Sequence, residues 1–164
     1  MEMEPLDKTE VLNALKQELA VQLELAHAAQ QHAQAGATHE ESKPENDKDT
    51  RAVEASYVAR GQARRVIDLE EAVVKVNALV PRSFVAGGPV ALGAVVQLED
   101  EQGSLWYLLA PAGGGLSLTV GSLTLIVVTP QSPVGHALVG RRVGDDVNIK
   151  SPQGRRECSL AALF

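Results

Sequence analysis

The sequence is poor in aromatic side chains, which make up 3% of its 164 residues. Small-molecule pockets and surfaces that stack nucleic-acid bases depend on aromatic rings for contact area, so both kinds of site are disfavoured. Cysteine is also scarce, and the single residue Cys158 excludes an internal disulfide bond and a zinc site built from cysteines. We expect Cys158 to be a small, half-buried apolar residue within a strand.

Long hydrophobic runs are absent, and no apolar stretch approaches the length needed to cross a bilayer. The N-terminal stretch MEMEPLDKTE is acidic where a signal peptide would be positively charged. These two features predict a soluble, cytoplasmic protein with no membrane partner.

An excess of positive charge is missing as well, because the formal net charge is −6. Residues 1–79 carry 15 acidic and nine basic side chains, whereas residues 80–164 carry six of each. The negative first half disfavours electrostatic binding to bare nucleic acid, and it favours a protein or a metal ion as partner.

The first half has the pattern of two long helices. Glycine is absent from Leu6 to Ala35, and the pattern of apolar residues resumes at Ala52 after an acidic stretch. Apolar residues recur every three or four positions, which is typical of one helix face: Leu12, Leu15, Leu19, Leu23, Ala26, Ala29 and Ala33, then Ala52, Ala55, Ala59, Val66, Leu69, Val73, Val76 and Val80. We predict an antiparallel coiled-coil hairpin over residues 1–80, with its tip at residues 38–50. Each arm of the hairpin would have roughly 30 residues, so at about 1.5 Å per residue it would reach about 45 Å.

We expect the protein to be a monomer, although two apolar residues of the first helix leave pairing with a second chain open. Val21 and Leu25 fall outside the main apolar stripe of the first helix and could pair with another chain.

The second half has the pattern of a small α+β domain. Proline and glycine mark residues 81–89 as a linker, and residues 90–164 then alternate strand-like runs with turn signals. The strand-like runs are VALGAVVQLED, SLWYLLA, LSLTVGSLTLIVV and the two arms of DDVNIKSPQGRRECSLAAL. The segment SPVGHALVG begins with the Ser-Pro signal of a helix start and ends on glycine, so we predict a short helix there.

The run SPVGHALVGRRVGDDVNIKSPQGRRECSL resembles the C-terminal signature of the Gre transcript cleavage factors, GreA and GreB. The order of an N-terminal coiled coil and a C-terminal domain is similar to theirs along the whole chain. The resemblance implies an antiparallel-sheet domain of FKBP-like fold. It also implies a bacterial transcription elongation factor that docks at the secondary channel of RNA polymerase and inserts its coiled coil.

In that family, acids at the coiled-coil tip help to hold a catalytic Mg²⁺ beside the RNA 3′ end, inside the polymerase active site. Few carboxylates are needed, because Mg²⁺ prefers oxygen ligands and keeps several of its waters. The resemblance therefore implies an accessory factor with no catalytic residues of its own. It also places polymerase contacts at the loop and short helix around Ser132, Pro133, Val134 and Leu138.

The tip is where this sequence departs from the family pattern Asp-Leu-x-Glu-Asn. Its best match is Ser42–Asn46, in which Glu45 and Asn46 carry over and Ser42 replaces the aspartate. Because a serine hydroxyl cannot act as an anionic ligand, we consider Glu41 together with Glu45 as candidate Mg²⁺ ligands. The weaker candidates Asp47 and Asp49 could instead cap the second helix.

Three arginines, Arg60, Arg64 and Arg65, cluster on the predicted second helix. They could form a basic patch that faces RNA or the polymerase. Alternatively, they serve solubility, with Arg64 and Arg65 pairing with Asp68 and Glu70 at helical spacing.

Four functions remain open from the sequence. The first is a factor that modulates elongation and stimulates RNA cleavage, and the second is a regulator or inhibitor that binds the same channel without cleavage. The third is an FKBP-like prolyl isomerase, which would need Phe84, Trp106, Tyr107 and Phe164 to line its pocket. The fourth is a coiled-coil adaptor with no role at polymerase.

Overall fold

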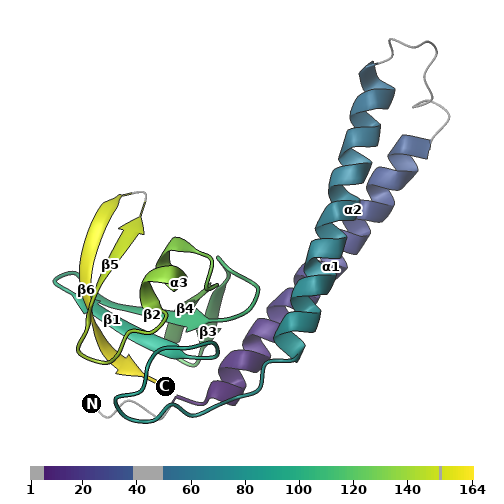
Figure 1. The fold of residues 1–164 in the computed structure, drawn as a ribbon. Helices are drawn as coiled ribbons and strands as arrows, with labels where there is room; N and C mark the ends of the chain where they lie inside the picture. The colour runs from purple at the N-terminus through teal and green to yellow at the C-terminus, as the bar shows by residue number, and fades with distance from the viewer. Residues whose placement is uncertain (1–5, 39–49, 152) are drawn as a thin grey trace. The chain divides into compact units, whose positions relative to one another are not determined.

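Two long antiparallel helices form the first half of the chain, as predicted (Figure 1). In this computed structural model, which describes residues 6–38, 50–151 and 153–164, they are α1 (Lys8–Thr38) and α2 (Thr50–Asn77). Neither these helices nor the short one in the described second half carries the apolar stretch that crossing a bilayer would require.

The predicted apolar seam is buried most completely in its leucine and valine part. The most buried members are Leu12, Leu15, Leu19, Ala26, Val66, Leu69 and Val76. The alanines nearer the far end of each helix are half-buried, since a methyl group covers less of the partner helix. The prediction was wrong at Val80, because α2 ends at Asn77 and the Val80 side chain is exposed.

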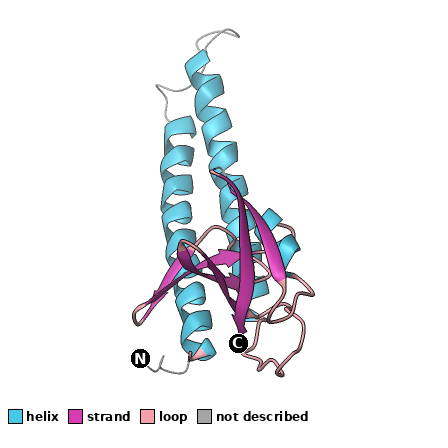
Figure 2. Cartoon of the chain, turned by 90° about the vertical axis from the view of Figure 1, so that its left-hand side faces the viewer, coloured by secondary structure: helices cyan, strands magenta, loops and turns pink. Residues whose placement is uncertain are grey.

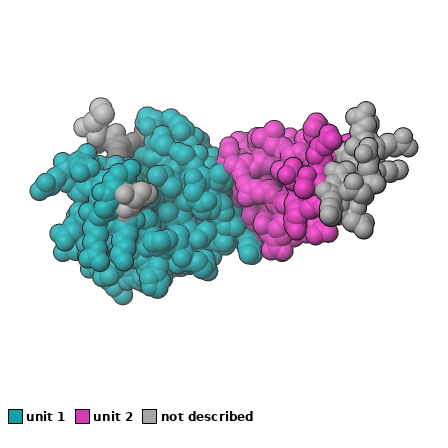
Figure 3. Space-filling model, turned by 90° about the horizontal axis from the view of Figure 1, so that it is seen from above, with its two compact units in different colours: residues 1–16, 75–164 teal, residues 17–74 magenta. Residues whose placement is uncertain are grey.

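The chain divides into two compact units (Figure 3). Residues 17–74 form one unit, and residues 1–16 and 75–164 form the other. The first turn of α1 is fastened within its own unit: the Lys8 ammonium donates to the backbone oxygens of Arg82 at 2.6 Å and Phe164 at 3.0 Å. It also lies over the Phe84 ring. Burial, together with the nearby charge of Arg82, lowers the pKa of Lys8 to about 8.

The second half folds as one six-stranded sheet with a short helix (Figure 2). Its strand order is β3-β4-β2-β1-β6-β5. The elements are β1 (Val95–Asp100), β2 (Gly103–Leu109), β3 (Ser117–Val120), β4 (Leu123–Val128), α3 (Pro133–Leu138), β5 (Asp146–Ser151) and β6 (Gly154–Leu163). The sheet is mixed, because β2 and β4 pair in parallel while every other pair is antiparallel.

One predicted run proved to be two strands. The sequence LSLTVGSLTLIVV turns back on itself at Gly121, whose φ of 59° is favourable for glycine, so β3 and β4 form a hairpin. Leu118 then pairs with Leu125 across that hairpin, and both side chains are buried.

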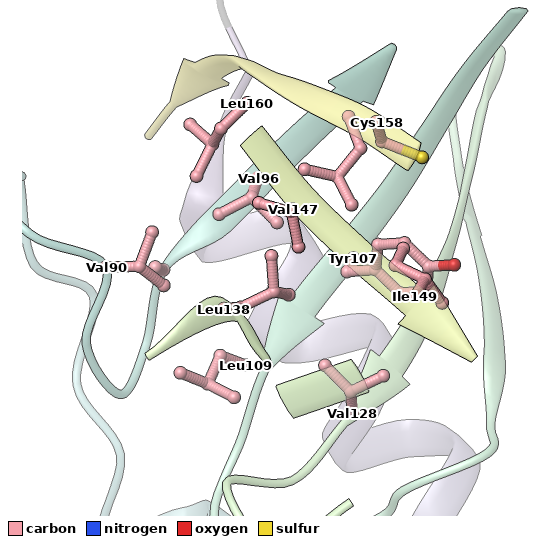
Figure 4. Packing of buried hydrophobic residues seen from close by; sticks show 12 residues of the cluster. Val90, Val96, Tyr107, Leu109, Val128, Leu138, Val147, Ile149, Cys158 and Leu160 are labelled. Atoms are coloured by element: carbon pink, nitrogen blue, oxygen red, sulfur yellow. The ribbon is translucent and has the colours of Figure 1, made fainter. Parts of the chain in front are cut away.

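The core of this domain fills the space between the sheet and α3 (Figure 4). Leu138 of α3 lies among Val96, Leu109 and Val147 and is fully buried. Cys158 belongs to the same cluster and is almost completely buried, which raises the pKa of its thiol. The predicted place of this residue in a strand is confirmed, but its side chain is almost fully buried and not half-buried as expected.

Candidate functional site

The loop before α3 is held by the Ser132 side chain. Its hydroxyl donates to the Thr129 carbonyl at 2.8 Å and accepts from the Gly135 backbone N–H at 3.0 Å. Pro133 occupies the first helical turn, where its fixed φ suits the helix and its missing N–H costs nothing. These contacts confirm the helix start predicted from Ser-Pro, and they make the loop a defined surface.

Gly135 allows this loop to pack closely on the end of β4. A Cβ atom at position 135 would overlap the Thr129 carbonyl oxygen, which is backbone and has little freedom to move. Any larger residue would push α3 away from the sheet, so the position of Pro133 and Val134 depends on this glycine.

An apolar pocket of about 310 Å³ opens beside this loop. Its walls come from β2, the loop between β2 and β3, β4, the start of α3 and β5: Tyr107, Gly114, Gly115, Ile126, Val127, Val128, Ser132, Pro133, Val134, Ile149 and Lys150. Ile126, at 41% exposure, is accessible to a partner, and Lys150 supplies the one charged side chain of the lining. This geometry suits an apolar side chain presented by another protein.

The four residues predicted to contact polymerase divide into two groups. Ser132, Pro133 and Val134 all line the pocket. Leu138 does not, because its side chain points into the core and is fully buried. Its predicted place on the contact surface was therefore wrong: the inward face of a short helix packs on the sheet, and position 138 lies on that face.

Sequence reasoning missed Ile126 and Ile149 as parts of this site. In β4 the exposed Ile126 stands between the buried residues Leu125 and Val127. The exposed Thr124, two positions before Ile126, marks the same side of the strand, so the alternation of the sequence could have indicated that Ile126 faces solvent. The sequence could not show that Ile126 lies near the start of α3 and β5, because that depends on contacts between distant segments.

The aromatic residues do not gather at the pocket. Only Tyr107 lines it. Trp106 instead stacks on Phe164, with ring centroids 5.8 Å apart, and the Phe84 ring lies beside the cationic groups of Lys8 and Arg82.

The three arginines of α2 have separate environments. Arg64 forms an ion pair with Asp68 at 3.0 Å, as the solubility interpretation predicted. The other predicted pair was wrong, because Arg65 donates to the Gln22 side chain at 3.2 Å while Glu70 lies 3.7 Å from the His27 imidazole. Arg60 lies over the Tyr57 ring. All three arginines are exposed, so a contact surface of this charge is available on α2.

The candidate tip residues lie outside the described part of the chain. This applies to Glu41, Ser42, Glu45, Asn46, Asp47 and Asp49, so the predicted Mg²⁺ ligands stay predictions. Within residues 6–38, 50–151 and 153–164, no three histidine, cysteine or acidic side chains come together in a way that could hold a metal ion.

Comparison with known proteins places these features in context. Residues 86–162 match the family described as transcription elongation factor, GreA/GreB, C-terminal, and this range contains the whole pocket. The transcription inhibitor protein Gfh1 of Thermus thermophilus is 30% identical over 125 residues, covering 72% of this chain and 73% of that protein. The transcription elongation factor GreA of Desulfovibrio desulfuricans is 28% identical over 140 residues, covering 83% and 82%.

Among solved structures, the crystal structure of GreA factor homolog 1 (Gfh1) of Thermus thermophilus is similar to this one. It is 25% identical, covers 92% of this chain and 95% of its own, and superposes with a TM-score of 0.40.

Proposed function

Because this chain belongs to the GreA/GreB family of transcription factors, we propose that it binds RNA polymerase at the secondary channel and modulates transcription. The observation that carries the proposal is the pocket beside α3. It lies within the matched range, is mostly apolar, and is bordered by a loop that Ser132 and Gly135 hold in place. A preformed loop is a good contact element, since little conformational freedom is lost on binding.

The coiled coil is the part that would enter the channel. A helix of 31 residues, such as α1, is about 45 Å long. In the polymerase complex it would carry residues 38–50 toward the active site and the RNA 3′ end. There Glu41 and Glu45 would share a Mg²⁺ ion with the polymerase, since carboxylate oxygens are suitable ligands for it. The chain would act through the polymerase and would not be an enzyme itself.

Two features favour inhibition over stimulated cleavage. Ser42 stands where the family tip has an aspartate, which removes one of the anionic groups that cleavage would use. In addition, a relative that is 30% identical bears the name transcription inhibitor protein. We therefore favour a regulator that occupies the channel without promoting cleavage, and we keep cleavage stimulation as the second candidate.

A transcription assay separates the two candidates. The protein is added with Mg²⁺ to stalled elongation complexes, and transcript lengths are followed during a chase with nucleotides. We expect slower extension and no shortened transcripts. Shortened transcripts that disappear with Glu45→Ala would establish cleavage stimulation instead. Absence of any binding to polymerase would refute the proposal and favour the adaptor.

Prolyl isomerase activity has weaker support. A pocket for a proline ring needs several aromatic walls, and Tyr107 is the one aromatic residue in the lining. The other three candidates lie elsewhere in the domain, in contacts of their own.

A further inference from the structure

The flank of α1 carries apolar side chains that the hairpin does not cover. Val21 is 51% exposed and Leu25 is 65% exposed, although both lie in the middle of a long helix. They border a shallow groove of about 420 Å³ that Glu18, Val21, Gln22, Leu25, Ala26, Gln62 and Arg65 line. All of these residues belong to the unit of residues 17–74.

The exposed stripe has a regular spacing. Glu18, Val21, Leu25, Ala28 and His32 follow one another at intervals of three or four residues, so they share one face of α1. Apart from Glu18, which is half-buried, these side chains are exposed. We call these five residues the α1 flank.

The order of residues in the α1 flank is close to symmetric about Leu25. Going outward from Leu25, the flank has an apolar residue on each side, Val21 and Ala28, and then a polar one, Glu18 and His32. If two flanks meet in antiparallel orientation, Leu25 contacts its own equivalent and Val21 faces Ala28 of the other copy. Glu18 then faces His32, so a carboxylate meets an imidazole N–H at both ends.

We propose that the α1 flank binds the same flank of a second copy of this chain, across a twofold axis that passes near Leu25. A twofold interface is self-complementary, and this surface meets that condition in its apolar pattern and in the hydrogen-bond acceptor and donor that Glu18 and His32 offer. A parallel arrangement would place Glu18 against Glu18, which is repulsive. The expected monomer is then the dissociated form of a weak, reversible dimer, and the inference goes beyond the proposed function because it does not depend on polymerase.

Cross-linking tests the position of the axis. Leu25→Cys places a thiol next to its own equivalent, so mild oxidation should give mainly disulfide-linked dimer. Ile67→Cys is the matched control, because Ile67 is 46% exposed in the middle of α2 but lies outside the α1 flank. The natural Cys158 is buried and should not react. Equal cross-linking of the two variants would overturn the proposal.

Sedimentation of the reduced full-length chain tests the pairing. His32→Glu sets acid against acid and should weaken the dimer, and Glu18→Lys combined with His32→Glu should restore it. Leu25→Glu should raise the dissociation constant roughly tenfold or more, with helicity unchanged by circular dichroism. A chain that stays monomeric at every concentration overturns the proposal, as does a dimer that Leu25→Glu leaves unaffected. Weaker polymerase binding by Leu25→Glu in a monomeric chain would assign the flank to the polymerase instead.

Discussion

At the scale of single residues, two glycines in helices have opposite surroundings. Gly135 of α3 is buried against the backbone of Thr129, whereas Gly61 of α2 has open space where a Cβ would be added. Neither has a positive φ, so the difference between them is one of packing and not of backbone conformation.

The two glycines should therefore respond in opposite directions to alanine. We expect Gly135→Ala to lower the free energy of unfolding by about 1–3 kcal/mol, because the methyl group displaces α3 from the sheet. Gly61→Ala should raise it by about 1 kcal/mol through helix propensity alone. Urea unfolding measures both changes, and a neutral Gly135→Ala would contradict the close packing of this loop.

A second residue-scale feature is the ion pair between Asp100 and Arg156. The Arg156 guanidinium donates through Nε to the Asp100 carboxylate at 2.7 Å and also through its terminal nitrogen. These hydrogen bonds lower the pKa of Asp100 below its usual value, against a smaller opposing effect of burial. The pair connects the turn between β1 and β2 to β6.

This pair should make the stability of the protein depend on acidic pH. The pKa of Asp100 is lower in the folded chain than in the unfolded one, so the stabilisation is present above about pH 4 and is lost as the pH falls through the folded pKa. The advantage of the natural chain over Asp100→Asn should thus shrink between about pH 7 and about pH 3 in urea unfolding. Glu101→Gln, in the same turn, serves as the control. A difference that is independent of pH would show that the charge of Asp100 is unimportant.

At the scale of elements, β4 and the start of α3 line one pocket, which is the proposed contact surface. The strand contributes Ile126 and the helix start contributes Pro133 and Val134 to one pocket. Leu138, on the opposite side of α3, is fully buried in the core. This packing fixes the orientation of the helix, so Pro133 and Val134 stay at the pocket.

A charge placed on this surface should weaken polymerase binding without unfolding the domain. We expect Ile126→Lys to reduce affinity for polymerase roughly tenfold or more, because an ammonium at the rim cannot be buried in an apolar contact. Val143→Lys is the control, since Val143 is similarly exposed at 46% but does not line the pocket. Thermal unfolding of both variants should be unchanged. Equal affinities of the two variants for polymerase would place the contact elsewhere.

At the scale of the whole molecule, binding and effect are assigned to different parts of the chain. The proposed docking surface belongs to the unit that includes residues 75–164, whereas the acidic segment predicted as the tip lies between α1 and α2 in the sequence. In this proposal the pocket determines the affinity for polymerase, and the acidic segment determines the effect on transcription.

The two parts should therefore be separable by mutation. Glu41→Ala combined with Glu45→Ala should bind polymerase with unchanged affinity and lose its effect on transcript extension. At low protein concentration, Ile126→Lys should neither bind polymerase nor affect transcript extension. At high protein concentration, its effect on transcript extension should return. Binding assays alongside the stalled-complex assay measure this, and a tip variant that loses affinity would show that the tip also contributes to docking.

The sequence by itself determined the features that depend on local periodicity and on neighbouring residues. The heptad spacing of leucine and valine predicts α1 and α2, Ser132 and Pro133 predict the start of α3, and the C-terminal signature predicts the family. Only the tertiary structure decided the pocket and the loss of Leu138 from it, because these depend on contacts between distant segments. The parallel pairing of β2 with β4 brings Tyr107 beside Ile126, and β5 adds Ile149 from farther along the chain. The sequence does not show which strands and helices lie side by side, so it could not show that these residues form one pocket.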